Sequence, residues 1–239
     1  MSEAPVALIT GGAKRLGAHL ARCLAKDGWD VAVNYRTSAA EAEALAAELA
    51  DLGVRSWTMQ ADVRRREDVT RMVETLERKA GRLDLLLNNV GIYEPKPLSE
   101  VTPDDWDRAI DANLSGSFYC VHAALPLLKV HGGNIVTIGY AGLDALTAAP
   151  EAAPYQVSKV GMLVLTKALA KELAPDGIRA NMISPGQLAN SVDLPEDLKA
   201  AIPAGRAGTL DDIAGALRYL LGAGYVTGVN IDVAGGYRL

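Results

Sequence analysis

The stretch VALITGGAKRLG, residues 6–17, decides the fold. Its first five residues are four apolar residues and the β-branched Thr10, which is typical of a buried strand. The glycines at 11 and 12 end that strand in a tight turn. Leucines at 16, 20 and 24 then follow the spacing of one helix face. Glycines let a backbone approach a pyrophosphate, and the first N–H groups of the following helix point toward it. The stretch therefore predicts a strand, a nucleotide-binding turn and a helix.

The rest of the chain repeats this alternation of short apolar runs and helical patterns. Further strands are expected at 31–35, 56–59, 83–87, 135–138, 180–183 and 229–233. A long helical stretch is expected over 104–130, with a kink at Pro126. Apolar strands separated by helices are typical of a parallel sheet that is covered on both faces. We predict an α/β fold: a Rossmann-type doubly wound parallel sheet of about seven strands, forming a single domain over 1–239.

Composition narrows the possible functions. The 239 residues include 24 basic and 29 acidic side chains, with a net charge of −5. This balance argues against a protein that coats nucleic acid. No apolar run approaches the roughly 20 residues of a membrane helix, and the N-terminus lacks the basic region of a signal peptide. We therefore expect a cytoplasmic protein that acts on a small molecule, with no nucleic-acid or membrane partner.

The cysteines and histidines give no sign of a metal site. Cys23 and Cys120 both fall inside apolar helical patterns, and neither belongs to a ligand-spaced pair. We expect both to be buried thiols in a reducing compartment. His19, His122 and His131 have no sequence partners that suggest catalysis or metal binding, so we expect no metal.

The end of the second predicted strand indicates which nucleotide binds. This position normally carries the residue that contacts the adenosine ribose; an acid favours a free 2′-hydroxyl and a base favours a 2′-phosphate. The segment here is Asn34-Tyr35-Arg36-Thr37-Ser38, which has no carboxylate, and Lys14 adds a second cation nearby. We therefore predict NADPH/NADP as the cofactor, rather than NADH.

Tyr155 and Lys159 stand four residues apart, on one face of a predicted helix. A phenol titrates near 10, too high for ready proton exchange at neutral pH. A nearby ammonium favours the phenolate and lowers the pKa of the phenol. Together with the nucleotide turn, the pair predicts proton transfer.

Seven motifs in order now give the chain a resemblance to the short-chain dehydrogenase/reductase family over essentially its whole length. They are the turn at 10–17, Asp62-Val63, Asn88-Asn89-Val90-Gly91, Asn113, Tyr155-Gln156-Val157-Ser158-Lys159, Pro185-Gly186 and the stretch 228–236.

The resemblance implies a role for each motif. Tyr155 would exchange the substrate proton, Lys159 would bind the nicotinamide ribose and tune Tyr155, and Asn113 would support a water relay to Lys159. The segment 187–205 would be a substrate lid, mobile until ligand binds. With the second strand end included, the expected cofactor-binding residues are Gly11, Lys14, Arg15, Leu16, Gly17, Tyr35, Arg36, Thr37, Ser38, Asp62, Val63, Asn89, Val90, Gly91, Lys159, Pro185 and Gly186.

The chain departs from the family pattern in two places. Arg15 replaces a usual glycine, and the resulting Thr-Gly-x-x-x-Arg-x-Gly turn resembles the pteridine reductases of the family. The serine that polarises the substrate carbonyl after the fifth strand is missing. Tyr140 takes its place when counted from the strand, Asp144 is the nearest aspartate, and a third alternative is that nothing replaces it.

Tyr93 occupies the position of the aromatic residue that sandwiches the pterin in pteridine reductases, although many family members have an aromatic here that only packs. The expected substrate contacts are therefore Arg15, Tyr93 and Tyr155. These features predict an NADPH-dependent reductase of a pteridine, assembled by family resemblance as a homotetramer. A 3-ketoacyl or general carbonyl reductase is the alternative enzyme. From another class, a non-catalytic NADP(H)-sensing protein would also fit the missing serine.

Overall fold

The computed structural model describes residues 4–191 and 194–238. Its centre is a seven-stranded sheet in the order β3-β2-β1-β4-β5-β6-β7. Every neighbouring pair of strands is parallel. This confirms the predicted α/β fold with a doubly wound sheet. The strands are β1 (Val6–Ile9), β2 (Asp30–Tyr35), β3 (Ser56–Gln60), β4 (Leu85–Asn88), β5 (Gly133–Ile138), β6 (Ile178–Pro185) and β7 (Asn230–Val233).

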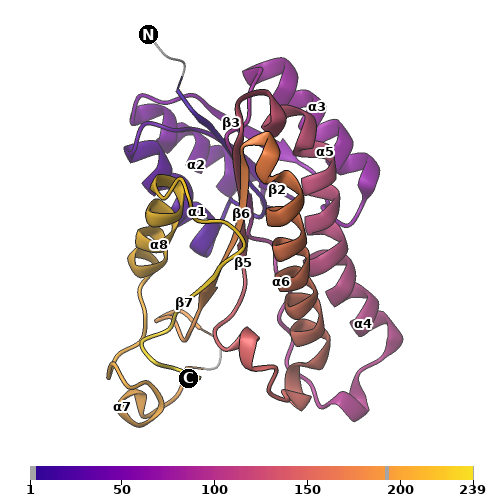
Figure 1. The fold of residues 1–239 in the computed structure, drawn as a ribbon, viewed down its shortest axis with the longest axis vertical. Coiled ribbons are helices and arrows are strands. Elements are labelled where there is room, and N and C mark those ends of the chain that lie inside the picture. Colours follow the sequence, from indigo (N-terminus) through magenta and orange to yellow (C-terminus); the bar gives the residue numbers. More distant parts are fainter. Residues whose placement is uncertain (1–3, 192–193, 239) are drawn as a thin grey trace.

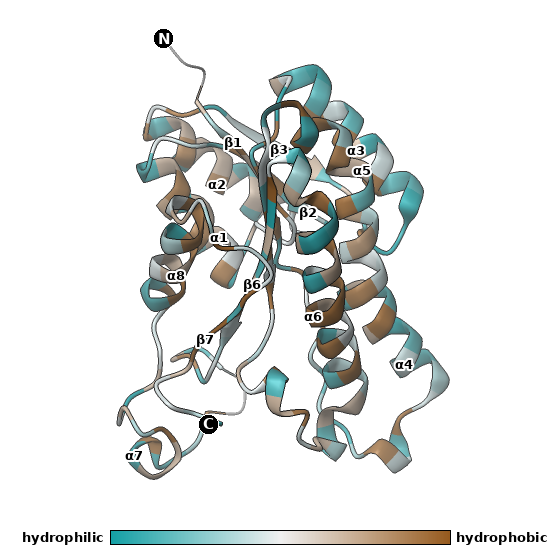
Figure 2. Ribbon diagram, in the orientation of Figure 1, coloured by the Kyte–Doolittle hydropathy of each residue, from teal (hydrophilic) through white to brown (hydrophobic). Residues whose placement is uncertain are grey.

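Helices cover both faces of the sheet (Figure 1). One face packs against α1, α2 and α8, and the other packs against α3, α5 and α6. Their inner sides and the strands between them form two hydrophobic cores, and Figure 2 shows the hydrophobic colour along the central strands. The helices are α1 (Arg15–Lys26), α2 (Ala39–Asp51), α3 (Arg66–Ala80), α4 (Pro103–Ile110), α5 (Gly116–His131), α6 (Ala153–Leu173), α7 (Leu198–Ala201) and α8 (Leu210–Gly222).

No helix in the described ranges is long and apolar enough to cross a membrane.

The long helical stretch is divided differently from our expectation. Helix α5 continues through Pro126, and the irregularity lies earlier, in a π-helical turn over Asp111–Ser115 that joins α4 to α5. The expected start is present, since Thr102 accepts a hydrogen bond from Asp105 N and Asp105 caps Thr102 N in return. Single π turns inside helices are frequent at functional sites, and this one contains Asn113.

The strand order reverses between β1 and β4, and one set of hydrogen bonds joins their carboxyl ends. Thr10 Oγ1 accepts from Asn89 N at 2.9 Å and from Val90 N at 3.2 Å. Asn89 Nδ2 donates back to Thr10 O at 2.9 Å and to Gly11 O at 3.1 Å. Ligands of doubly wound sheets bind at this switch point, so these bonds fix the shape of the binding edge.

Arg15 is held in a left-handed backbone conformation, with φ at +50°. It is the first residue of α1, in the place where the family usually has glycine. A residue with a Cβ atom pays about 1–2 kcal/mol for this conformation. The fold therefore carries strain at Arg15, and such strain is often retained where the side chain has a task.

Replacing Arg15 with glycine should relieve that strain. We expect Arg15→Gly to raise the free energy of unfolding by about 1 kcal/mol, measured by urea denaturation. Lys14→Gly is the matched control, because Lys14 has an ordinary extended φ of −140°. That control should lower stability, since glycine adds unfolded-state freedom there and removes the ion pair of Lys14 with Glu41. Equal losses in both variants would contradict strain at Arg15.

Candidate active site

A cavity of about 280 Å³ opens beyond the carboxyl ends of β1 and β2. It collects most of the residues expected to hold the adenosine half of a dinucleotide. The glycine turn borders one side and the end of β2 borders another, as the doubly wound topology predicts. The predicted residues that line this cavity are Gly11, Lys14, Tyr35, Arg36, Thr37, Ser38, Asp62, Val63 and Val90.

The charged groups in this cavity are not equivalent. The Lys14 ammonium contacts Glu41 at 2.6 Å, and the Asp62 carboxylate is paired with Arg64 at 2.5 Å. The hydrogen bond from Arg64 lowers the pKa of Asp62. Arg36 has no ion-pair partner among residues 4–191 and 194–238. Arg36 is therefore the cation most available to an incoming phosphate, while Arg64 is a neighbour that the sequence analysis did not single out.

The glycine turn is held in shape from two sides. A Cβ atom on Gly17 would lie 2.6 Å from Gly11 O and 2.8 Å from Asn89 Nδ2, so only glycine fits there. On the other side, Asn34 Oδ1 accepts from Gly11 N at 3.1 Å, and Asn34 Nδ2 donates to Met59 O within β3 and to Ala61 O just after it. Sequence reasoning gave Asn34 no role of its own, although an amide within an apolar strand was a visible signal.

Tyr155 and Lys159 lie in the first turns of α6, with the Lys159 Nζ atom 5.6 Å from the centre of the Tyr155 ring. Lys159 is buried and donates to Ile138 O at 2.7 Å. Burial lowers the pKa of Lys159 from 10.5 to about 8. A Cβ atom on Gly91 would approach Nζ to 3.3 Å, so a glycine there leaves room for the ammonium.

Asn113 is fully buried in the π turn, behind the two catalytic candidates. Its side chain accepts from Ile92 N at 2.7 Å and donates to Ile92 O at 3.1 Å and Ser158 Oγ at 3.0 Å. It therefore ties the segment after β4 to the first turns of α6. This network fixes the position of α6 beside the sheet edge.

A second cavity, of about 300 Å³, opens on the other side of the switch point. Four tyrosines form part of its wall, namely Tyr93, Tyr140, Tyr155 and Tyr237. The Tyr93 ring meets the Tyr155 ring edge-on at 5.1 Å, and the Tyr140 ring lies 5.5 Å from Tyr155. The predicted residues that line this cavity are Arg15, Leu16, Tyr93, Tyr140, Tyr155, Pro185 and Gly186.

The structure separates the alternatives for the missing serine in space. Tyr140 lines the second cavity next to Tyr155. Asp144 instead accepts from Asn230 Nδ2 at 2.9 Å and lies 3.6 Å from the Lys167 ammonium, and it is not among the lining residues. Burial raises the pKa of Tyr140, while the charge of Arg238 and a hydrogen bond with Gln156 act in the opposite direction.

The C-terminus also reaches this cavity, which the sequence analysis did not anticipate. Tyr237 and Arg238 line it, and the Arg238 guanidinium carbon lies 5.5 Å from the Tyr140 ring centre and 5.4 Å from that of Tyr237. The family motif considered at this end stops at Gly236. The sequence did contain a signal: an aromatic residue and a cationic residue, Tyr237 and Arg238, directly follow the 228–236 motif.

The chain is similar to known proteins over nearly its whole length. The family model described as Enoyl-(Acyl carrier protein) reductase matches residues 11–238. A 3-oxoacyl-[acyl-carrier-protein] reductase of Staphylococcus aureus is 36% identical, with 96% of each chain covered.

Two solved structures are also similar. One is a variant of a Serratia marcescens short-chain dehydrogenase/reductase, with 31% identity, a TM-score of 0.91 and 98% of each chain covered. The other is a blue fluorescent protein from a metagenomic library in complex with NADPH, with 34% identity, the same TM-score of 0.91 and 98% of each chain covered. With a family match over nearly the whole chain and relatives above 30% identity, this chain belongs to the short-chain dehydrogenase/reductase family of oxidoreductases.

Proposed function

We propose that this protein is an NADPH-dependent reductase in which Tyr155 is the proton donor. The observation that carries the proposal is the place of Tyr155, in the wall of the second cavity with the buried ammonium of Lys159 beside its ring. When bound, the cofactor would supply the hydride. The residues of the chain would bind the substrate, give the proton and stabilise the phenolate that remains.

The residues present fit a dinucleotide with a 2′-phosphate. The glycine turn leaves no room for side chains at Gly17, and the turn presents the start of α1 to a pyrophosphate. Arg36 stands at the end of β2, where the 2′-substituent is normally recognised. The NADPH complex of a similar structure supports this assignment.

The proton path would run through the buried groups behind the cavity. Tyr155 gives its proton to the substrate, and the Lys159 ammonium stabilises the phenolate. Asn113, which fixes the segment after β4, would position a water relay that returns a proton toward Lys159. We assign Tyr140 as the hydroxyl that polarises the substrate, because it lies beside Tyr155 and Asp144 does not line the cavity.

We propose a pteridine as the substrate class. A flat heteroaromatic ring suits a cavity whose wall includes Tyr93, Tyr140 and Tyr237. Stacking on such rings contributes about 0.5–1.5 kcal/mol beyond area burial. Arg15 lines the same cavity in a strained conformation, and its guanidinium would donate to ring acceptors.

A 3-oxoacyl thioester is the second candidate. It is favoured by the similarity to a 3-oxoacyl-[acyl-carrier-protein] reductase over 96% of the chain. If the Tyr140 hydroxyl polarises a carbonyl as the usual serine does, the cavity could reduce this substrate as well. A pterin would stack on Tyr93, whereas the acyl chain of a thioester offers no ring to stack, so the two substrates should respond differently to the loss of Tyr93.

We further propose that the enzyme is cytoplasmic and forms a homo-oligomer. The family resemblance suggests that this oligomer is a tetramer. Exposed apolar side chains on α5 and α6 support an interface there, namely Phe118, Val157 and Val164. The single domain over 1–239 and the lid over 187–205 also stay predictions. Residues 192–193 of that lid lie outside the described residues.

Exchanging Arg36 for aspartate should reverse the cofactor preference. A charge-assisted phosphate contact contributes about 1.5–3 kcal/mol, so we expect the dissociation constant for NADPH to be lower than for NADH by about tenfold or more. Arg36→Asp should abolish or invert that ratio, measured by fluorescence titration. Lys14→Met is the control and should change the ratio less, because Glu41 already pairs with Lys14. Equal constants in the unmutated protein would end this assignment.

Activity should fall as pH rises through about 8. The buried Lys159 has its pKa lowered to about 8, so its ammonium is present below that pH and lost above it. Without the cation, the phenolate of Tyr155 is less stable, and kcat/KM for reduction should drop. In Lys159→Arg, whose guanidinium keeps its proton, the descending limb should move to higher pH at a lower overall rate. An unmoved limb would assign the titration to another group.

The substrate class can be tested with a matched pair of variants. We expect kcat/KM to be higher for dihydrobiopterin than for an acetoacetyl thioester, and Tyr93→Ala to reduce the pterin value by about fivefold or more through lost stacking. Tyr225→Ala is the control, because Tyr225 is fully exposed and lies outside both cavities. Tyr155→Phe gives the background rate without the proton donor, and we expect it to lower kcat/KM by about 10²–10⁴-fold. Faster turnover of the thioester with Tyr93→Ala neutral would favour the 3-oxoacyl substrate instead.

A further inference from the structure

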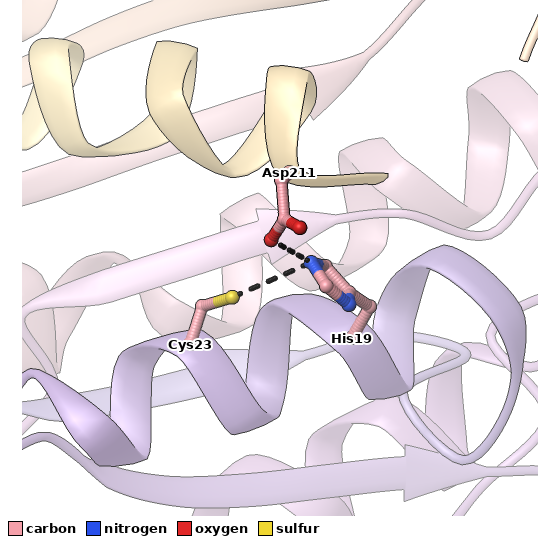
Figure 3. A group of neighbouring side chains, drawn as sticks. All are labelled: His19, Cys23 and Asp211. Carbon is pink, nitrogen blue, oxygen red and sulfur yellow. Dashed lines mark hydrogen bonds and ion pairs between the residues drawn. The ribbon is translucent and has the colours of Figure 1, made fainter. Parts of the chain in front are cut away.

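Three metal-ligating side chains meet between α1 and α8, outside both cavities (Figure 3). His19 and Cys23 stand one turn apart on α1, and Asp211 lies in the first turn of α8. His19 Nε2 lies 2.9 Å from Asp211 Oδ1 and 3.5 Å from Cys23 Sγ. All three ligand atoms lie within 4.8 Å of one another. The sequence analysis expected no metal here, because it considered each residue without a partner from elsewhere in the chain.

The distances suit a tetrahedral ion. Zinc–ligand bonds of about 2.0–2.3 Å place neighbouring ligand atoms roughly 3–4 Å apart. The 3.5 Å between His19 Nε2 and Cys23 Sγ already falls in that range, whereas the 2.9 Å between His19 Nε2 and Asp211 Oδ1 would have to open slightly. The separation of Cys23 and Asp211 is at most 4.8 Å, and the exposed Asp211 side chain can turn to adjust it. The same imidazole nitrogen faces both the sulfur and the carboxylate, as Figure 3 shows. A single ion could therefore replace both of the present contacts.

The chemistry of the three donors selects for a borderline-soft cation. Imidazole nitrogen, thiolate sulfur and carboxylate oxygen are all zinc ligands, whereas calcium and magnesium prefer oxygen alone. A thiolate and a carboxylate would together balance the charge of a divalent ion. Burial raises the pKa of the Cys23 thiol, and the nearby Arg218 cation opposes this shift. Metal binding would therefore release a proton and weaken at low pH.

An ion could reach the His19, Cys23 and Asp211 side chains from one side only. Cys23 is buried, while the side chains of His19 and Asp211 are 25% and 81% exposed. The ion would enter from the side of Asp211, and water would complete its coordination there. We propose that His19, Cys23 and Asp211 form a zinc site that joins α1 to α8.

Such a site would link distant parts of the chain. Helix α1 begins at the glycine turn, and α8 follows the segment that borders the second cavity. An ion bound only by the folded state stabilises that state by mass action. Zinc should therefore raise the Tm of the protein without any need for cofactor or substrate, so the test does not depend on the proposed reaction.

Cobalt titration of the metal-free, full-length protein is the direct experiment. We expect about one equivalent to bind with a sulfur-to-cobalt charge-transfer band, and zinc to displace it. Cys23→Ser should remove the band, and His19→Gln and Asp211→Asn should each weaken zinc binding by about tenfold or more. Zinc should raise the Tm of the unmutated protein by several degrees and that of Cys23→Ser by much less.

Two controls make the outcome decisive. Cys120→Ala removes the other thiol, which is buried in the opposite core, and should leave the band intact. His131→Gln removes a histidine remote from the cluster and should leave zinc affinity unchanged. A folded protein that gives no thiolate band would overturn the proposal. So would zinc affinity that is unchanged in Cys23→Ser and His19→Gln, because the ion would then be binding elsewhere.

Discussion

The hydrogen bonds between the ends of β1 and β4 are the constraint on which the rest of the site depends. Parallel strands leave their last carbonyls and amides without ladder partners, and burial makes unpaired groups costly. Thr10 and Asn89 satisfy one another across the switch point, and Asn89 also holds the Gly11 carbonyl. This sets the glycine turn against β4 and fixes the direction in which α1 begins. Both cavities take their shape from that edge.

Burying the Lys159 ammonium also costs free energy, and this cost constrains the residues that surround the ammonium. A lysine removed from water tends to lose its proton, which the lowered pKa reflects. The Ile138 carbonyl accepts from its ammonium, and Gly91 provides the space for it. Asn113, in a π turn, holds the segment after β4 in register with α6. The fold thus bears a local cost to keep a cation beside a phenol.

The wall of the second cavity is assembled from aromatic and cationic residues that come from distant parts of the chain. Arg15 comes from the start of α1, Tyr93 from the segment after β4, Tyr140 from the segment after β5, and Arg238 from the C-terminal end. The guanidinium of Arg238 over the Tyr140 ring supplies a cation–π contact where the usual serine is missing.

The sequence by itself determined the parallel sheet, the glycine turn and the Tyr155–Lys159 pair, because these follow from local periodicity, turn chemistry and helical spacing. It also placed residues that we expect to bind the cofactor near the ends of their strands, because a parallel sheet brings those ends to one edge. Only the tertiary structure decided which charges stay unpaired, as with Arg36 against Lys14, since Glu41 belongs to another element. It alone brought Arg238 to the cavity and Asp211 to His19, 192 residues away. Contacts between remote segments depend on how helices pack across the sheet, and no local pattern records that packing.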